Sequence, residues 1–234
     1  MGERLAIGPD SGRRPLKGLW RWVLLAALVG VLVARWFFVE LVVVRGNTMA
    51  PTVLEGDVLL VRRQARPTLG DVVLVAHEGR VVLRRVLGLP GEQVGAIEGV
   101  LTLANRALAT RVVGTFAYRE AADGGRARRQ QRFTESLADG RRHDILGDHA
   151  GAATPWSFDI PPAEVPAGHL FVLCDNRRTC PQDELAGMVP MADVQGVAER
   201  LLYYGEARER APEAVPFYGA WEWISSRSES SGRK

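Results

Sequence analysis

Two short stretches in the first half of the chain decide how the rest of the sequence is interpreted. They are Gly46-Asn47-Thr48-Met49-Ala50-Pro51-Thr52, followed by Gly56-Asp57, and Leu83-Arg84-Arg85-Val86-Leu87-Gly88-Leu89-Pro90-Gly91-Glu92. A third stretch, Cys174-Asp175-Asn176-Arg177-Arg178-Thr179-Cys180, comes much later. The Gly-Asp and Pro-Gly pairs in these stretches are turn signals. The first two stretches therefore each predict a turn beside a strand.

Short β-branched runs follow and precede these turns. Because Gly-Asp or Pro residues bound most of them, and no long run after residue 40 has helical periodicity, we predict a mostly β domain over residues 40–204. We expect two antiparallel sheets built from short strands. The expected strands are 40–45, 58–61, 71–75, 80–86, 93–97, 99–104, 106–113 and 165–173.

Residues 115–155 have a different composition, with many charges and several glycines. We interpret them as an insertion of hairpins and mobile loops that forms a smaller lobe. The basic run 126–132 is typical of a solvated loop, although it could also touch anionic lipid or nucleic acid. The whole chain has a formal net charge of only +3. Since its basic residues are interleaved with acidic ones, we expect no nucleic-acid partner.

An apolar segment precedes the domain. Residues 22–34 carry no charge, and extending them to 18–39 gives the length that a bilayer requires, with Arg21 and Arg35 near the ends. We predict a transmembrane anchor over 18–39. The basic tail 1–17 would be cytoplasmic and the domain extracytoplasmic. A cleavable signal peptide is the alternative. The C-terminal tail, 205–234, is expected to end in disorder.

The chain contains two cysteines, Cys174 and Cys180. Two are too few for a closed zinc site or a disulfide-rich scaffold. In an extracytoplasmic domain they could form a loop disulfide, and the alternative is a pair of free thiols. Because the chain lacks clustered metal ligands and phosphate-binding loops, we expect no metal and no organic cofactor.

Taken in order, the apolar segment and the three stretches resemble bacterial signal peptidase I, a membrane-bound Ser/Lys endopeptidase that removes signal peptides. The resemblance covers roughly residues 18–200. It implies an antiparallel β-sheet peptidase domain after one transmembrane helix. It also implies that the partners are the signal peptides of exported precursors and the lipid bilayer of the cytoplasmic membrane.

The resemblance also assigns roles to individual positions, and the reactive ones depart from the family pattern. Thr48 stands where the family has its nucleophilic Ser, and Arg84 stands where it has the Lys that acts as general base. Gly46 replaces a Ser that supplies an oxyanion donor, and Cys180 replaces the Ser that positions the Lys. Threonine can act as a nucleophile, but a guanidinium stays protonated at neutral pH and cannot accept a proton.

Other family positions are matched. Asp175, Asn176 and Arg177 have the residue types of the family's third box, and we expect Asp175 to pair with Arg177 or Arg84. Apolar residues near the first box would line or support a peptide groove, unless they are ordinary core. These groove candidates are Leu41, Val43, Met49, Pro51 and Val53, with Val42 beside them.

Three functional hypotheses follow. In the first, the chain is a membrane-anchored, catalytically impaired member of the export machinery that binds precursor peptides. In the second, it is an active endopeptidase with Thr48 as nucleophile and an unidentified base. In the third, the groove serves an unrelated partner. The histidines that could act as base under the second hypothesis are His77, His143, His149 and His169.

Overall fold

The structure is a computed structural model that describes residues 19–77, 79–120, 124–147, 154–156, 159–178 and 187–205, without the side chains of residues 19 and 32–37. The chain divides into two units, Met1–Phe37 and Phe38–Lys234. Each is described here by itself. The tails 1–17 and 206–234, and the residues Cys180 and His149, lie outside the described residues.

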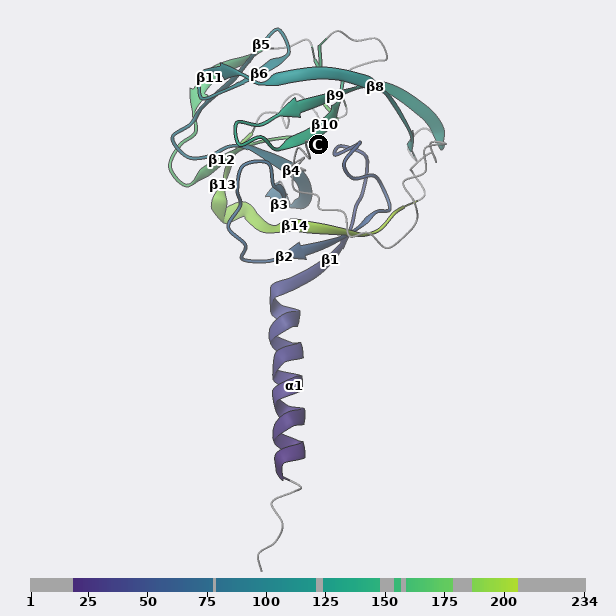
Figure 1. Cartoon of the computed structure of the whole chain (residues 1–234), viewed down its shortest axis with the longest axis vertical. Coiled ribbons are helices and arrows are strands. Elements are labelled where there is room, and N and C mark those ends of the chain that lie inside the picture. Colours follow the sequence, from purple (N-terminus) through teal and green to yellow (C-terminus); the bar gives the residue numbers. More distant parts are fainter. Residues whose placement is uncertain are drawn as a thin grey trace, which may run out of the picture. The chain divides into compact units, whose positions relative to one another are not determined.

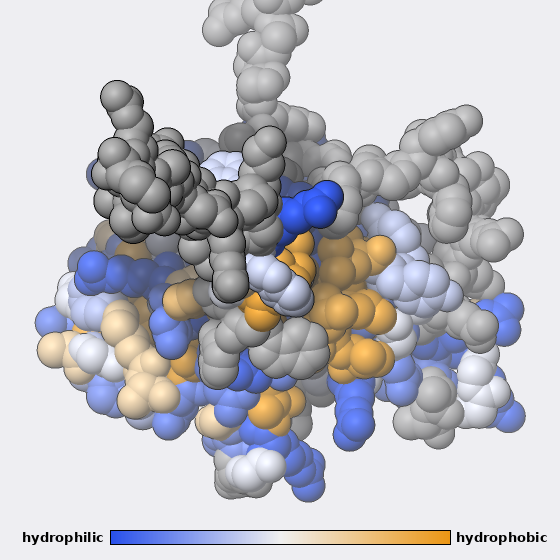
Figure 2. Space-filling view, turned by 90° about the horizontal axis from the view of Figure 1, so that it is seen from below, coloured by the Kyte–Doolittle hydropathy of each residue, from blue (hydrophilic) through white to orange (hydrophobic). Residues whose placement is uncertain are grey.

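The first unit contains the helix α1, Leu19–Phe38 (Figure 1). Its sequence is rich in Leu and Ala, which favour a helix, and its described side chains are exposed. Apolar side chains gather in the centre of the face seen in Figure 2, and hydrophilic ones surround them. Within the described residues, no helix combines the length and the hydropathy needed to span a membrane.

The second unit is built on a seven-stranded antiparallel sheet, with strand order β1-β2-β14-β3-β4-β12-β13. Every neighbouring pair in it is antiparallel. Strands β1 and β13 form the two edges. The strand bounds are β1 Val39–Val43, β2 Val58–Arg62, β3 Val72–His77, β4 Arg80–Gly88, β12 His169–Leu173, β13 Gly187–Pro190 and β14 Val194–Tyr203, with a short 3-10 helix, η2, at Met191–Asp193.

Two smaller antiparallel sheets lie on the side of this unit away from β1 and β2 (Figure 1). One has the order β11-β5-β6-β7, and the other has the order β10-β9-β8. The mostly β, antiparallel class is thus confirmed, with three sheets among the described residues instead of two. Their bounds are β5 Gln93–Ile97, β6 Val100–Leu103, β7 Arg106–Ala107, β8 Ala109–Glu120, β9 Arg126–Ser136, β10 Arg142–Leu146 and β11 Ile160–Glu164.

The large sheet has apolar cores on both faces, and the central strand β3, which is apolar from Val72 to Ala76, contributes to both. On β3, Val72 and Leu74 pack in one core cluster, while Val73 and Val75 pack in another with β12 residues Leu170 and Val172. Successive side chains on a strand point to opposite faces, so one apolar run supplies two cores. The first cluster also contains residues of the first box, which fixes that box against the sheet.

The predicted insertion contains hairpins, as expected, formed by β8 with β9 and by β9 with β10, but it also differs from the expectation. Strand β8 begins at Ala109, before the predicted boundary, and the basic run 126–132 lies within β9 instead of a loop. A parallel bridge between Leu146 of β10 and Asn176 joins this sheet to the third box. The basic run did not suggest a strand because its first residues, 126–129, are mostly exposed and the run lacks apolar alternation.

Candidate functional site

The first box forms a compact turn between β1 and β2. Within it, the amide of Val53 donates to the carbonyl of Met49, and Asn47 Oδ1 accepts the amide of Glu55 at 3.0 Å. Met49 and Val53 are buried in the core, whereas Thr48 is only partly buried. The core side chains therefore anchor the box and leave Thr48 at its surface.

Asn176 of the third box holds the main chain around Thr48. Its amide donates to the carbonyl of Thr48 at 2.9 Å, and its Nδ2 donates to the carbonyl of Asn47 at 3.0 Å. The same Nδ2 donates to the Tyr118 hydroxyl at 3.0 Å. Asn176 is fully buried, so these bonds have no competition from water. That Asn176 supports a functional site stays a prediction.

Asp175 forms a buried ion pair with Arg85. Arg85 Nε donates to Oδ1 at 2.7 Å and Nη2 to Oδ2 at 2.6 Å, and Thr52 donates its hydroxyl to Oδ2 at 2.5 Å. Burial alone would raise the pKa of the Asp175 carboxyl, but Arg85 outweighs burial and the pKa lies below its ordinary value. The prediction that Asp175 pairs with Arg177 or Arg84 is wrong. Neighbouring strand residues face opposite ways, and Arg85 is the one whose side chain reaches the two boxes.

Arg177 is compensated by the three-stranded sheet. Its Nη2 donates to Glu135 Oε2 at 2.8 Å, and its guanidinium lies 4.5 Å from the centre of the Trp156 ring. His143 Nε2 lies 3.0 Å from the same Glu135 oxygen, out of line for a hydrogen bond. All of these charged and aromatic side chains are buried. The third box is therefore supported by residues of the inserted sheet.

Burial by itself shifts the pKa values of His143 and Glu135 in opposite directions. It lowers the pKa of His143, and the charge of Arg85 lowers it further, so this imidazole is neutral at pH 7. For Glu135, burial would raise the pKa, but Arg177 and His143 outweigh it and the pKa lies below its ordinary value. The cluster thus holds one carboxylate, one guanidinium and a neutral imidazole.

Arg84 is almost completely buried, with 3% exposure, in the middle of β4 and opposite Val73 of β3. Its Nη1 donates to the carbonyl of Leu83 at 2.8 Å. Within the part of the chain that the structure describes, no hydrogen bond joins Arg84 to Thr48. A buried guanidinium can donate hydrogen bonds here, but it cannot take a proton from a hydroxyl.

Gly46 lies two residues before Thr48 and has a left-handed backbone, with φ of 77°. A Cβ atom built on it would meet nothing within 4 Å. There is therefore space for a side chain, but the backbone conformation is one that residues other than glycine adopt at a cost.

The remaining predicted residues occupy different environments. Of the groove candidates, Leu41 and Val43 are exposed on the edge strand β1 and Pro51 is partly buried, while Met49 and Val53 are core.

Two of the candidate bases lie on strands away from the first box. His77 is exposed at the end of β3, and His169 begins β12 with its ring near the carbonyl of Ala167. Cys174 is buried and disulfide-bonded, and pairing with Cys180 stays a prediction because Cys180 lies outside the described residues.

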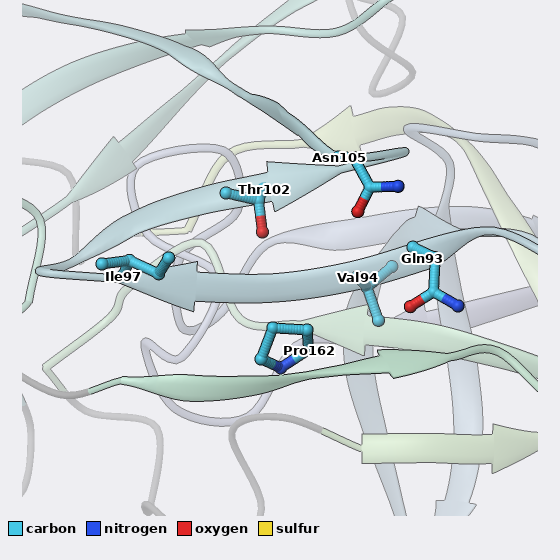
Figure 3. A pocket seen from close by; sticks show the side chains of 6 residues that line it. All are labelled: Gln93, Val94, Ile97, Thr102, Asn105 and Pro162. Atoms are coloured by element: carbon cyan, nitrogen blue, oxygen red, sulfur yellow. The ribbon is translucent and has the colours of Figure 1, made fainter.

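A small open pocket of about 180 Å³ lies elsewhere, on the sheet that contains β5, β6 and β11. Figure 3 shows Gln93 and Asn105 at one end of it, Ile97 at the other, and Pro162 across from β5. None of the residues assigned to the Thr48 site lines this pocket. The pocket is thus a separate feature of the fold.

The geometry described so far is a mostly β domain in which Arg85 of β4, the turn of the first box and the loop of the third box are joined by hydrogen bonds beside Thr48. The family model described as "Signal peptidase, peptidase S26" matches residues 18–203. The chain therefore belongs to this family, as the resemblance of its boxes implied.

Individual relatives share low sequence identity with this chain. A probable signal peptidase I-1 of Synechocystis sp. is 23% identical over 79% of this chain and 84% of its own length. Signal peptidase I P of Bacillus subtilis subsp. natto is 23% identical over 83% of this chain and 94% of its own. A crystal structure of a signal peptidase I from Enterococcus faecalis is 24% identical and covers 57% of this chain and 97% of that one, with a TM-score of 0.32.

Sequence reasoning missed the residues that the inserted sheet contributes to the site. Tyr118, Gln130, Glu135 and Trp156 are all buried and lie within or beside the segment interpreted as a mobile insertion. Gln130 Nε2 bonds to the carbonyl of Gly147 at 2.8 Å and lies 3.4 Å from Asn176 Oδ1. The sequence contained one signal, the aromatic pair Phe116 and Tyr118 just before a charged run, but no pattern showed what Tyr118 contacts.

Proposed function

We propose that this protein is a catalytically impaired member of the signal peptidase family, which binds the signal peptides of exported precursors without cleaving them efficiently. The proposal combines a family scaffold with altered residues at the reactive positions. It assigns Thr48 and Arg84 to the positions of nucleophile and base, and Gly46 and Cys180 to the positions of two supporting hydroxyls. The remaining residues of the boxes hold the site together.

The observation that carries the proposal is the burial of Arg84. A Ser/Lys peptidase needs a buried amine that loses its proton near neutral pH. Arg84 occupies the strand position for that base, is 3% exposed and already donates to the carbonyl of Leu83. Since desolvation cannot neutralise a guanidinium at pH 7, this group cannot activate Thr48. It can still donate hydrogen bonds, including to the carbonyl of a bound peptide.

The scaffold around this altered site supports retained binding. Asn176 fixes the main chain on both sides of the Asn47–Thr48 peptide, and Arg85 ties Thr52 to Asp175. These contacts involve matched family positions and do not depend on the nucleophile or the base. An extended peptide could then bind by adding to a strand edge, which is a common mode of peptide recognition.

Membrane anchoring is part of the same proposal. The helix α1 has 20 residues, which are apolar or small apart from Arg21 and Arg35, its described side chains are exposed, and basic residues precede it in the sequence. We place the amino terminus in the cytoplasm and the β domain on the other side of the cytoplasmic membrane. The full chain should then sediment with membranes and need detergent for its release.

The test is cleavage of a purified preprotein in detergent by three forms of the full chain. These are the natural protein, Thr48→Ala, and the double variant Thr48→Ser with Arg84→Lys. We expect no cleavage by the first two and a gain of cleavage by the double variant. Binding of a fluorescent synthetic signal peptide to each form would be measured in parallel and should be retained in all three.

The outcomes separate the hypotheses. Cleavage by the natural chain that disappears in Thr48→Ala would show an active Thr48 endopeptidase and overturn the proposal. Thr48 is only partly buried, so a peptide carbonyl could approach its hydroxyl if a base were present. A chain that binds no signal peptide in any form would instead favour a groove used for an unrelated partner.

A further inference from the structure

Among the described residues, Glu135 is the one carboxylate that hydrogen-bonds to Arg177. The Arg177 side chain is buried, and Glu135 of β9 provides the carboxylate at 2.8 Å from Nη2. Within the described part of the chain, its Nε and Nη1 have no hydrogen-bond partner. A buried guanidinium is costly unless it is paired, so the position of Arg177 depends on Glu135.

Arg177 directly follows Asn176, whose hydrogen bonds hold the turn at Thr48. The amide of Arg177 donates to the carbonyl of Leu146 at 3.0 Å, and the amide of Leu146 donates to the carbonyl of Asp175 at 2.9 Å. These two bonds flank Asn176, whose own amide donates to the carbonyl of Thr48. A contact chain therefore runs from Glu135 through Arg177 and Asn176 to Thr48.

We propose that Glu135 is a positioning residue for the Thr48 site: it holds Arg177, and through it Asn176, in the place where Asn176 can fix the Thr48 turn. The residue lies in the inserted sheet, outside the three boxes. This inference rests on the proposed function, which gives the Thr48 site its role in peptide binding. The contacts that hold the Thr48 turn in place can be tested independently of that role.

The groups that face Glu135 agree with this role. Arg177 from the third box donates to Oε2, and His143 from β10 lies beside the same oxygen. Arg85 and Asp175 contribute further charges of opposite sign, which balance each other. Glu135 therefore keeps its negative charge for Arg177, with a neutral imidazole beside it.

The experiment is hydrogen exchange of the full chain in detergent, followed segment by segment, for the natural protein and for Glu135→Gln. We expect exchange in residues 174–178 and 47–54 to become about tenfold faster or more, because the amides of Asn176 and Arg177 lose their fixed acceptors. Segments of β2 and β14 should be unchanged. Glu120→Gln is the matched control, since Glu120 pairs with Arg128 at the other end of the same hairpin.

Unchanged exchange at 174–178 and 47–54 in Glu135→Gln would overturn the proposal. Equal acceleration across all segments would overturn it as well, because Glu135 would then serve only overall stability. Should Glu135→Gln fail to fold, the double variant Glu135→Gln with Arg177→Met removes both charges and is expected to fold. Faster exchange in the two segments of that variant supports the proposal, and retained protection contradicts it.

A binding measurement separates this inference from the proposed function. Glu135→Gln should weaken binding of a fluorescent synthetic signal peptide severalfold, and Glu120→Gln should not. If the natural chain binds no such peptide, the proposed function fails, while the exchange result still decides whether Glu135 positions the site. Normal binding by Glu135→Gln together with faster exchange at Thr48 would show that peptide affinity does not depend on this turn, which would contradict the proposed role.

Discussion

Gly46 shows how a single residue links the backbone to the altered chemistry of the site. Its φ of 77° places it in the left-handed region, and the position two residues before Thr48 is where the family resemblance assigns a hydroxyl donor. The surrounding space is open, so a serine side chain would fit. The backbone conformation is what opposes it.

We therefore expect Gly46→Ser to cost about 1–2 kcal/mol of stability. Gly46→Ala should cost the same, because the penalty comes from Cβ and not from the hydroxyl. The measurement is denaturant unfolding of the detergent-solubilised chain. An unchanged midpoint in both variants would mean that this turn readily adopts another conformation.

At the scale of elements, β4 is the strand that organises the site. It pairs with β3 on one side and β12 on the other, and it carries both arginines of the second box. Its last residue, Gly88, packs closely against the neighbouring core. A Cβ on Gly88 would lie 2.7 Å from Val94 Cγ1 and 3.0 Å from Phe171 Cβ.

Gly88→Ala should therefore overpack this core and destabilise the domain by about 1–3 kcal/mol. Gly187→Ala on β13 is the matched control, since its Cβ would make only an ordinary contact of 3.4 Å with Val189. Thermal unfolding of both variants checks the prediction. Equal melting temperatures for the two would show that Val94 and Phe171 can move aside without loss.

Much of the element pattern could be predicted from the sequence. Strands β2 to β5 were expected because turn signals bound short apolar runs, and their observed bounds agree closely. Hairpins were expected in residues 115–155, but the basic run 126–132 was assigned to a loop, because it offers no apolar alternation to mark it as part of β9. The partner of Asp175 could not be predicted either. That choice depends on which way Arg84 and Arg85 face, and so on the register of β4 against its neighbours.

At the scale of the whole second unit, buried ionisable groups concentrate where the sheets meet the third box. Burial and Arg85 lower the pKa of His143, and the pKa values of Glu135 and Asp175 are also lowered because charged partners outweigh burial. In each case the folded protein binds its proton at lower pH than the unfolded chain does. When the pH falls, protonation therefore favours the unfolded chain.

We expect stability to fall in stages with acid. The contribution of His143 is lost below its ordinary value of 6.5, that of Glu135 below 4.5 and that of Asp175 below 3.8. Each group adds a slope of at most about 1.4 kcal/mol per pH unit. Denaturant unfolding between pH 8 and pH 2 measures this, and His143→Gln should remove the first stage. A profile that is flat from pH 7 to pH 5 in the natural protein would contradict the assignment.

The hydrogen bonds between Leu146 and the third box also constrain the design of chimaeras between members of this family. Asp175 and Arg177 take main-chain partners from the end of β10, so the three-stranded sheet supplies hydrogen bonds that the third box lacks by itself. A chimaera in which a short loop replaces residues 109–147 would leave these groups unsatisfied inside the protein. The inserted sheet and the third box are therefore one module, and they have to be transplanted together.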